Sequence, residues 1–290
     1  MSTIVEIGGA STIGKRERQE DCFMAYHMVE ELPKKSRRFS VETDRHVNMG
    51  VVCDGMGGME QGAPCARQAV QAYCETFAET GSFNTMWKER MFMSLYAANA
   101  AVNDFKEAMD MKGSYSGCTL VSAVISDDKL HYISVGDSYL LLFRKEQGTK
   151  QYKEHRLNVR HKDSYKFYTN EAGEEVNELI SEEEEIELRK EGLPANIKIR
   201  HYVSSAILGD TINKLDCQTD FKLTDGDVVI LASDGVLQGL GDIERENIVI
   251  NFANVPAQQM AEEIIRAIDK SGKPRQDNAS CVVFKISVNQ

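Results

Sequence analysis

The sequence lacks the features that indicate a membrane protein or a secreted, disulfide-rich protein. No apolar run approaches the roughly 18 residues that a membrane-spanning helix needs, and no basic start followed by a long apolar segment opens the chain. The seven cysteines are odd in number and include no C-x-x-C pair, which argues against a disulfide framework and a zinc knuckle. We therefore expect a cytoplasmic protein with no membrane partner.

Basic residues are also in deficit, and this limits the partners the chain can have. With 34 Lys and Arg against 45 Asp and Glu, the net charge of -11 repels a phosphodiester backbone, so we expect no nucleic acid partner. The apolar fraction of 42% is typical of a globular protein with a substantial core, and 290 residues permit one or two domains.

A conventional nucleophile is missing as well. No Cys or Ser stands in a recognisable local motif with a His partner, and the six His show no i, i+4 pairing of the kind that binds a metal on one helix face. His131, inside an apolar run, is interpreted as structural. Ser138, after Asp137, is interpreted as a turn residue that orients the aspartate rather than as a nucleophile.

What the chain does have is a series of short β-rich runs with long helices between them. The predicted helices are 63–78, 91–109 and 256–271, each with apolar residues spaced three or four apart. This order favours helices packed outside a double sheet over alternating βαβ units. The predicted strands are 22–29, 46–53, 118–125, 130–136, 139–144, 197–203, 227–233 and 280–286.

Two stretches are predicted to be surface insertions. Residues 161–196 are polar and acidic, and Ser181 with Glu184 forms a capping box for a short helix, which indicates a flap between strands. The charged run PKKSRR (33–38) is predicted to be a solvated turn joining the first two strands.

The pattern that points to chemistry is an aspartate at the end of successive apolar runs. Asp54, Asp137 and Asp234 each end such a run, and Asp277 stands just before the last strand. Carboxylates gathered at the rim of a core repel one another, and hard divalent cations such as Mg²⁺ or Mn²⁺ remove that penalty. Two such ions can hold a hydroxide and bind phosphate oxygens. Each Asp-Gly is alternatively a turn signal, the interpretation we prefer for LTDGDVV (223–229).

The early segment GKRERQEDCF contributes candidate anion-binding residues. On an extended chain Arg16, Arg18 and Glu20 share one face, so a guanidinium beside a metal-linked carboxylate could hold a phosphate by two parallel hydrogen bonds. A solvated surface is the ordinary alternative for such a charged run.

At this point the residues resemble the metal-dependent protein phosphatases of the protein phosphatase 2C family, in a bacterial-type form. Seven segments match in order: G-x-R-x-x-Q-E-D (14–21), VVCDGMGG (51–58), GCTLVSAVI (117–125), ISVGDSYLLLFR (133–144), SSAILGD (204–210), ILASDGVLQGL (230–240) and QDNASCVVF (276–284). The Asp-Gly-x-Gly-Gly, Gly-Asp-Ser and Ser-Asp-Gly blocks are the specific ones.

The resemblance implies an α+β fold, an α-β-β-α sandwich of two antiparallel sheets flanked by helices, and a single catalytic domain over 1–290 with a flap at about 161–203. It implies a serine/threonine phosphatase, a monomer, that acts on phosphoproteins through two or three Mg²⁺ or Mn²⁺ ions and a metal-activated water. By position, the resemblance implies that Asp54 bridges two metals and that the Gly55 carbonyl binds one of them. It implies that Asp234 and Asp277 complete the other site, and that Asp137 and Asp234 form a weaker third site. It further implies that Glu20 and Asp21 hold metal-bound waters and that Arg16 binds phosphate.

Three departures from the family pattern bear on this expectation. Met56 stands where many animal members have a His general acid, so a metal-bound water near the third site is the candidate replacement. HKDS (161–164) matches the family's Asp-His pair poorly, and no basic residue directly precedes Leu208 and Gly209. Two alternatives remain: a catalytically silent relative that acts as a binding module, and a phosphatase dedicated to a partner such as a bacterial anti-sigma antagonist.

Overall fold

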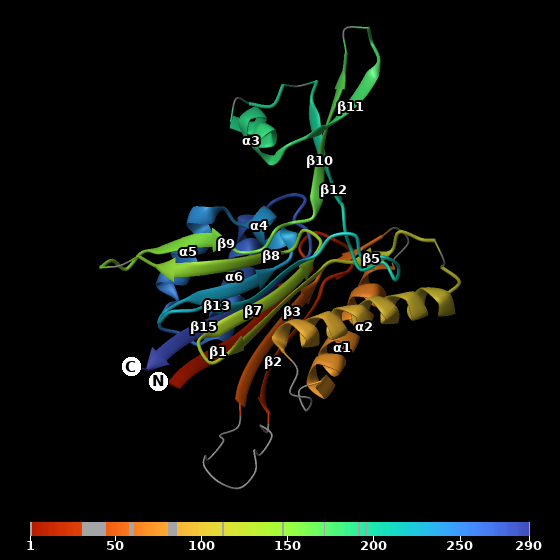
Figure 1. Ribbon diagram of the computed structural model, residues 1–290. Coiled ribbons are helices and arrows are strands. Elements are labelled where there is room, and N and C mark those ends of the chain that lie inside the picture. The colour runs from red at the N-terminus through yellow and green to blue at the C-terminus, as the bar shows by residue number, and fades with distance from the viewer. Residues whose placement is uncertain are drawn as a thin grey trace.

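The chain folds around two five-stranded antiparallel sheets (Figure 1). The computed structural model describes residues 2–30, 45–57, 61–80, 86–111, 113–146, 148–170, 172–190, 192–194 and 196–289. One sheet has the order β1 (Ser2–Thr12), β15 (Ala279–Asn289), β14 (Val228–Ala232), β8 (Tyr139–Lys145), β9 (Tyr152–Arg156). The other has the order β13 (Asp216–Lys222), β7 (Lys129–Val135), β6 (Leu120–Ser126), β3 (Arg45–Cys53), β2 (Cys22–Glu30).

Helices cover both outer faces of this pair of sheets. Helices α1 (Gly62–Thr80) and α2 (Trp87–Ala108) pack on the sheet that contains β3, while α4 (Asp234–Gly239), α5 (Asp242–Asn251) and α6 (Ala257–Ser271) pack on the sheet that contains β14. Figure 1 shows these two helical layers on opposite sides. The predicted α-β-β-α sandwich is therefore confirmed, together with the three predicted helices.

Successive side chains of the central strands point alternately toward the covering helices and toward the opposite sheet, and both of these faces are buried. In β6, Leu120 and Val124 belong to the cluster under α1 and α2, whereas Val121 and Ala123 belong to the cluster between the sheets. In β14, the side chain of Ile230 likewise packs toward the helices while its neighbours pack toward the other sheet. A strand buried on both faces reads as a continuous apolar run, which is why these strands were predicted.

Strand β1 was not predicted, because Gly8 and Gly9 interrupt its apolar pattern. A Cβ on Gly8 would lie 2.4 Å from the backbone of Gln258, so glycine here lets α6 approach the strand. The strands β9 and β13 were also missed, since their half-exposed residues are largely polar. The predicted strand 118–125 is two elements, β5 (Gly117–Cys118), which pairs with β4 (Gly55–Met56), and β6, interrupted at Thr119.

The segment with Arg16 and Arg18 does not run extended, so the prediction that these side chains share one strand face with Glu20 is wrong. Turns and bends occupy residues 14–18. The run 33–38 lies outside the described residues. The turn predicted within LTDGDVV is confirmed: Asp225 and Gly226 form it, and the Asp227 carboxylate accepts a hydrogen bond from the Thr224 amide at 2.8 Å.

The acidic insertion forms a flap that projects from one end of the sandwich (Figure 1). It comprises a three-stranded sheet in the order β11 (Glu175–Ile180), β10 (Lys162–Thr169), β12 (Lys198–Val203), with α3 (Glu182–Lys190) between β11 and β12. The hydroxyl of Ser181 accepts a hydrogen bond from the Glu184 amide at 3.1 Å, as the predicted helix cap requires, while the Glu184 carboxylate bonds Lys166. The strands β10 and β11 were not predicted, because their composition is polar.

A single buried carboxylate, Glu185, ties α3 to the flap sheet. It accepts hydrogen bonds from Ser164 at 2.7 Å and Arg189 at 2.9 Å, and its Oε1 lies 2.8 Å from His201 Nε2. Burial opposes the ionisation of Glu185, but these contacts outweigh it and lower its pKa to about 2. A depressed carboxyl pKa stabilises the fold above the ordinary value of 4.5, and this stabilisation is lost as the pH falls toward about 2.

We therefore predict that Glu185→Gln loosens the flap and leaves the sandwich intact. The flap should lose about 1 to 3 kcal/mol of local stability near pH 7, and this loss should shrink as the pH falls below about 4.5. Hydrogen exchange of the β10–β12 amides, corrected for the intrinsic effect of pH, measures the change. Faster exchange in the central strands β6 and β14 as well would contradict a local role.

No helix within the described ranges is long and apolar enough to cross a membrane.

Candidate active site

Five carboxylates from distant parts of the chain meet at the end of the sandwich near the flap. Asp54 follows β3, Asp137 lies between β7 and β8, Asp234 opens α4 directly after β14, and Asp277 precedes β15. The fifth, Asp21, precedes β2. The sheet topology brings these strand ends together, because β14 and β15 pair in one sheet while β2 and β3 pair in the other.

Their mutual repulsion shows in the pKa values. The pKa of Asp54 is raised well above its ordinary value, first by burial and then by Asp21, Asp234, Asp137 and Asp277. Burial, followed by neighbouring carboxylates, raises the pKa of Asp234 to about 7. Asp54, Asp234 and Asp277 are thus electrostatic neighbours, as the sequence predicted, and their shared charge is costly in the absence of a compensating cation.

Asp21 is buried and is held by Ser233, the residue that follows β14. Its Oδ2 accepts a hydrogen bond from the Ser233 hydroxyl at 2.7 Å, while its Oδ1 is buried without a hydrogen-bond partner in the described part of the chain. Burial raises its pKa to about 6, against the hydrogen bond from Ser233. An unsatisfied buried carboxylate oxygen fits an outer ligand that binds a metal through water.

Arg16 and Glu20 lie beside this group, on the bend that precedes β2. The Arg16 guanidinium donates to Asp277 Oδ2 at 2.6 Å, and the Arg16 side chain is 59% exposed. Burial raises the pKa of Glu20, and Arg16 opposes that rise. The structure therefore brings the predicted phosphate-binding arginine to the carboxylates, where it pairs with one of the predicted metal ligands.

The glycines after Asp54 and Asp234 allow close contacts between chain segments rather than hairpin turns. A Cβ on Gly55 would lie 2.5 Å from the Glu20 carbonyl oxygen, and one on Gly235 would lie 1.9 Å from the Asn278 carbonyl oxygen. Only glycine fits at these crossings. Two of the Asp-Gly pairs thus belong to the site.

Asn278, next to Asp277, was not predicted to be functional, and it holds the bend that carries Arg16. Its Oδ1 accepts from the Glu20 amide at 2.8 Å, and its Nδ2 donates to the carbonyls of Ile13 and Arg18, each at 2.9 Å. The side chain is 5% exposed. Its place inside the motif QDNASCVVF was the signal available in the sequence.

A buried network behind Asp54 and Asp137 was also missed. The Thr119 hydroxyl accepts from the Asp54 amide at 3.0 Å and shares a hydrogen bond of 2.7 Å with Ser138 Oγ. Ser138 therefore acts through Thr119 on the backbone of Asp54. His161 Nδ1 accepts from the Gly136 amide at 3.1 Å, and burial lowers its pKa, which agrees with a neutral ring as acceptor.

The remaining predicted contributor of a carboxylate, Asp137, faces the base of the flap. Burial raises its pKa, while Arg160, Lys162 and His201 lower it. The interpretation of His131 as structural agrees with its contacts: its Nδ1 accepts from the Asp220 amide at 3.1 Å, and its ring stacks on Trp87 with centroids 4.9 Å apart.

The donor set fits hard divalent cations, since it consists of carboxylate and carbonyl oxygens with no thiolate or imidazole among them. Within the described residues, no group of three or more His, Cys, Asp or Glu side chains is arranged to hold a metal ion as it stands. The residues therefore fit a divalent cation in charge and in ligand chemistry, because a bound cation would relieve the repulsion among these adjacent carboxylates.

Comparison with known proteins agrees with this geometry. The S. agalactiae serine/threonine phosphatase is 19% identical, with a TM-score of 0.66, and the match covers 99% of this chain and 100% of that one. The Mycobacterium tuberculosis serine/threonine phosphatase PstP/Ppp is 18% identical, with a TM-score of 0.64, over 98% and 99%. The catalytic domain of PstP in complex with two manganese ions is 18% identical, with a TM-score of 0.60, over 99% and 100%.

These likenesses establish the fold, and a search of curated proteins gave no match. A model of the family described as protein phosphatase 2C matches residues 7–166, which is more than half of the chain. The chain belongs to the protein phosphatase 2C family of protein serine/threonine phosphatases.

Proposed function

We propose that the chain hydrolyses phosphoserine and phosphothreonine in proteins with two or three Mg²⁺ or Mn²⁺ ions, residues 1–290 forming one catalytic domain. The observation that carries this proposal is the convergence of Asp21, Asp54, Asp137, Asp234 and Asp277, each of which is close enough to others to change their pKa values. The manganese complex of the structurally similar PstP domain supports the choice of metal.

In this proposal each residue has a separate task. Asp54 and the Gly55 carbonyl would hold one ion; Asp54, Asp234 and Asp277 would hold the other; Asp137 with Asp234 would hold the weaker third. Divalent ions bound there would lower the pKa of a water and neutralise phosphate oxygens. Glu20 and Asp21 would accept hydrogen bonds from waters at the rim, and Met56 can donate no proton.

Arg16 would orient the phosphate. Its exposed guanidinium can exchange the single contact with Asp277 for a phosphate oxygen, because an ion pair at a largely exposed side chain contributes little. A planar guanidinium can donate two parallel hydrogen bonds to a phosphoryl group, which fixes its position for in-line attack.

The direct test is Mn²⁺-dependent turnover of p-nitrophenyl phosphate, followed by phosphoserine, phosphothreonine and phosphotyrosine peptides in parallel. We expect turnover of the first two peptide classes, and a loss on the order of a hundredfold or more in Asp234→Asn, because that carboxylate would contact two ions. The matched control is Asp127→Asn, an exposed turn residue at φ 55°, a conformation that asparagine tolerates.

Two outcomes would redirect the proposal. Mn²⁺ binding with no turnover of any substrate would favour a catalytically silent binding module. Turnover of one phosphoprotein with none of the generic peptides would favour a phosphatase dedicated to a single partner, such as an anti-sigma antagonist.

A further inference from the structure

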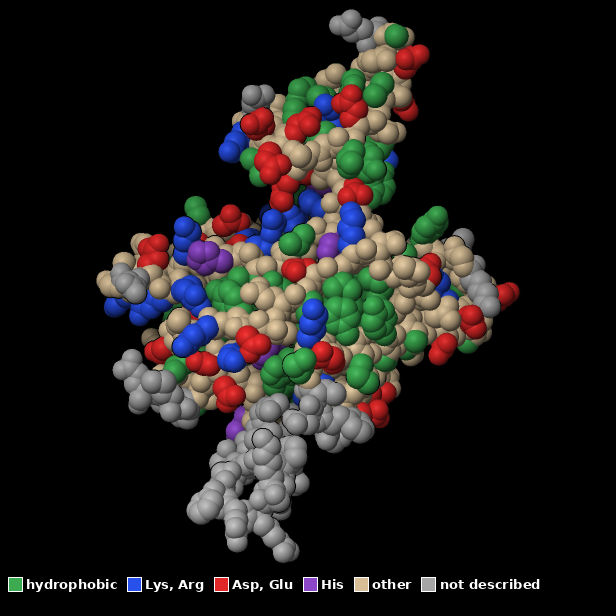
Figure 2. Space-filling model, in the orientation of Figure 1, with side chains coloured by type: hydrophobic (Ala, Val, Ile, Leu, Met, Phe, Trp, Pro, Cys, Tyr) green, Lys and Arg blue, Asp and Glu red, His purple; other side chains and the backbone are tan. Residues whose placement is uncertain are grey.

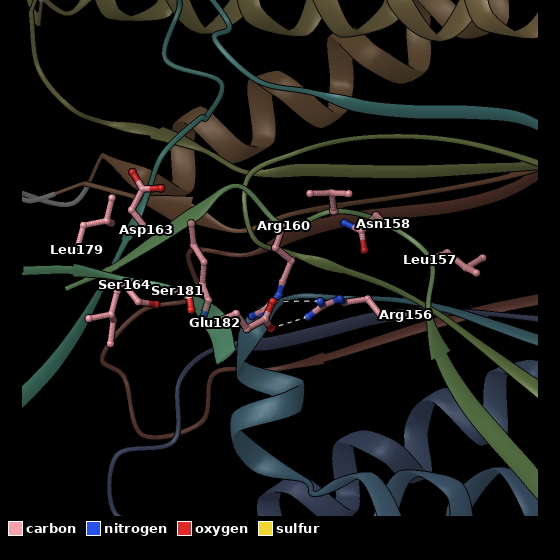
Figure 3. Close-up of a pocket in the computed structure, with 12 residues that line it drawn as sticks. Arg156, Leu157, Asn158, Arg160, Asp163, Ser164, Leu179, Ser181 and Glu182 are labelled. Atoms are coloured by element: carbon pink, nitrogen blue, oxygen red, sulfur yellow. Dashed lines mark hydrogen bonds and ion pairs between the residues drawn. The ribbon is translucent and has the colours of Figure 1, made fainter. Parts of the chain in front are cut away.

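A cavity of about 640 Å³ lies where the flap joins the body of the protein, outside the carboxylate group described above. Its walls come from the segment between β9 and β10, from the start of β10 and from the residues around the beginning of α3 (Figure 3). Three basic residues line it, namely Arg156, Arg160 and Lys162. Figure 2 shows Lys and Arg side chains gathered at this junction, below the acidic side chains of the flap.

One anion of the protein holds two of these cations. The Glu182 carboxylate lies 3.2 Å from Arg156 Nη1 and 3.0 Å from Arg160 Nη2, and Figure 3 shows it between the two guanidinium groups. The nearby Glu185 is engaged by other donors and lies 4.0 Å from Lys162 Nζ. Asp163, the other carboxylate of the lining, lies 3.7 Å from Lys214 Nζ. Among the lining residues, Glu182 therefore supplies the carboxylate that pairs with the two guanidinium groups.

Arg160 is held in one position by its contacts with Tyr139 and Glu182. Its Nη1 donates to the Tyr139 hydroxyl at 2.5 Å, and its guanidinium stacks on that ring, 4.6 Å from the centroid. The side chain is only 12% exposed, and its Nε is buried without a hydrogen-bond partner in the described segments. A guanidinium held in one orientation is suited to a planar or tetrahedral anion, which would take the place of Glu182 at Nη2.

The cavity adjoins the proposed active site. Arg160 and Lys162 both lower the pKa of Asp137, which burial raises, so their charges act on that carboxylate directly. Tyr139, which supports Arg160, is two residues after Asp137. A group bound in the cavity would consequently lie on the Asp137 side of the proposed active site.

We propose that this cavity binds an anionic side chain of the phosphoprotein substrate, a carboxylate or a second phosphoryl group, close to the residue that is dephosphorylated. The inference rests on the proposed phosphatase function and names its substrate class. Glu182 occupies the place of that anion in the free protein. Its side chain is 49% exposed, so exchanging its ion pairs for those of a substrate costs little.

The experiment uses phosphothreonine peptides with one glutamate placed at each flanking position in turn, matched glutamine peptides, and peptides with phosphoserine at the preferred position. We expect the best glutamate peptide to exceed its glutamine counterpart in kcat/KM by about three- to tenfold, through a lower KM. The phosphoserine series separates the two sources of negative charge.

Two variants assign the preference to the cavity. In Arg156→Gln the ratio of glutamate to glutamine peptide should fall to about one, because KM for the acidic peptide rises. In Glu182→Gln the ratio should rise, because the competing carboxylate is gone. As a control, Lys153→Gln removes a positive charge from an exposed side chain of β9, the strand that also carries Arg156, outside the cavity lining. This variant should leave the ratio of glutamate to glutamine peptide unchanged.

Failure of this inference can be told from failure of the proposed function. Turnover of p-nitrophenyl phosphate and of neutral peptides without any preference for acidic ones would overturn the inference alone, as would equal losses on all peptides in Arg156→Gln. If nothing is turned over, fluorescence anisotropy of the labelled peptides still measures the preference, and equal affinity for both series would overturn it.

Discussion

Replacing Asp54 by asparagine is expected to abolish metal-stimulated turnover and, in metal-free buffer, to stabilise the fold. The neutral amide removes a carboxylate whose pKa is raised well above its ordinary value by burial and by four other carboxylates. We expect the free energy of unfolding near pH 7 to rise by about 1 to 2 kcal/mol, and turnover to fall on the order of a hundredfold or more. Urea unfolding followed by the fluorescence of Trp87, the single tryptophan, measures the first effect.

The pH dependence has a definite sign. In the folded chain Asp21 has a pKa of about 6 and Asp234 a pKa of about 7, whereas the ordinary value is 3.8. At a pH between the ordinary value and these raised values, the folded chain therefore binds more protons than the unfolded chain. The metal-free wild type should therefore gain stability as the pH falls from about 7 toward 4, and the advantage of Asp54→Asn should shrink. A variant that is less stable than the wild type at pH 7, and that still turns over substrate, would contradict this account of Asp54.

Replacing Asn278 by alanine is expected to cost both stability and turnover. The change removes three hydrogen bonds of a buried residue: Oδ1 accepts from the Glu20 amide, and Nδ2 donates to the carbonyls of Ile13 and Arg18. Each such bond contributes about 1 kcal/mol, so a loss of about 2 to 4 kcal/mol is expected. Turnover should fall about tenfold or more, because the bend that carries Arg16 is released.

Asn177→Ala is a suitable control, since Asn177 is exposed on β11 of the flap. Kinetics at saturating Mn²⁺ separate the two roles of Asn278: a positioning residue for Arg16 should raise KM for phosphorylated substrates beyond any loss of folded protein. Unchanged KM with a reduced amount of folded protein would leave Asn278 a purely structural residue.

The sequence allowed the sandwich and most of the carboxylate group to be predicted, for a common physical reason. Strands buried on both faces read as continuous apolar runs, and each run ended at an aspartate such as Asp54 or Asp234. Because strand ends in a sandwich meet at the same rim, the linear pattern translated into proximity. The family resemblance predicted Arg16 beside the carboxylates, whereas the period-two spacing wrongly predicted that it lies on an extended strand.

The site residues that were not predicted hold other residues in position, and they belong to no residue type that by itself indicates a metal or phosphate site. Asn278, Thr119 and His161 hold backbone amides or carbonyls of the site, and a buried polar residue next to a motif carries no signal of which backbone group it meets. The flap sheet escaped because its strands are polar. The cavity at its base escaped because Arg156 and Glu182 are far apart in sequence and meet only through the docking of α3.

The central claim is that the converging carboxylates hold the ions on which hydrolysis depends. Calorimetric titration of Mn²⁺ into the wild type and Asp54→Asn, with p-nitrophenyl phosphate turnover measured on the same samples, tests it most directly. We predict at least two Mn²⁺ per wild-type chain, turnover that follows occupancy, and loss of both in Asp54→Asn. Turnover that survives exhaustive chelation, or Mn²⁺ binding that is the same in the two proteins, would contradict the claim.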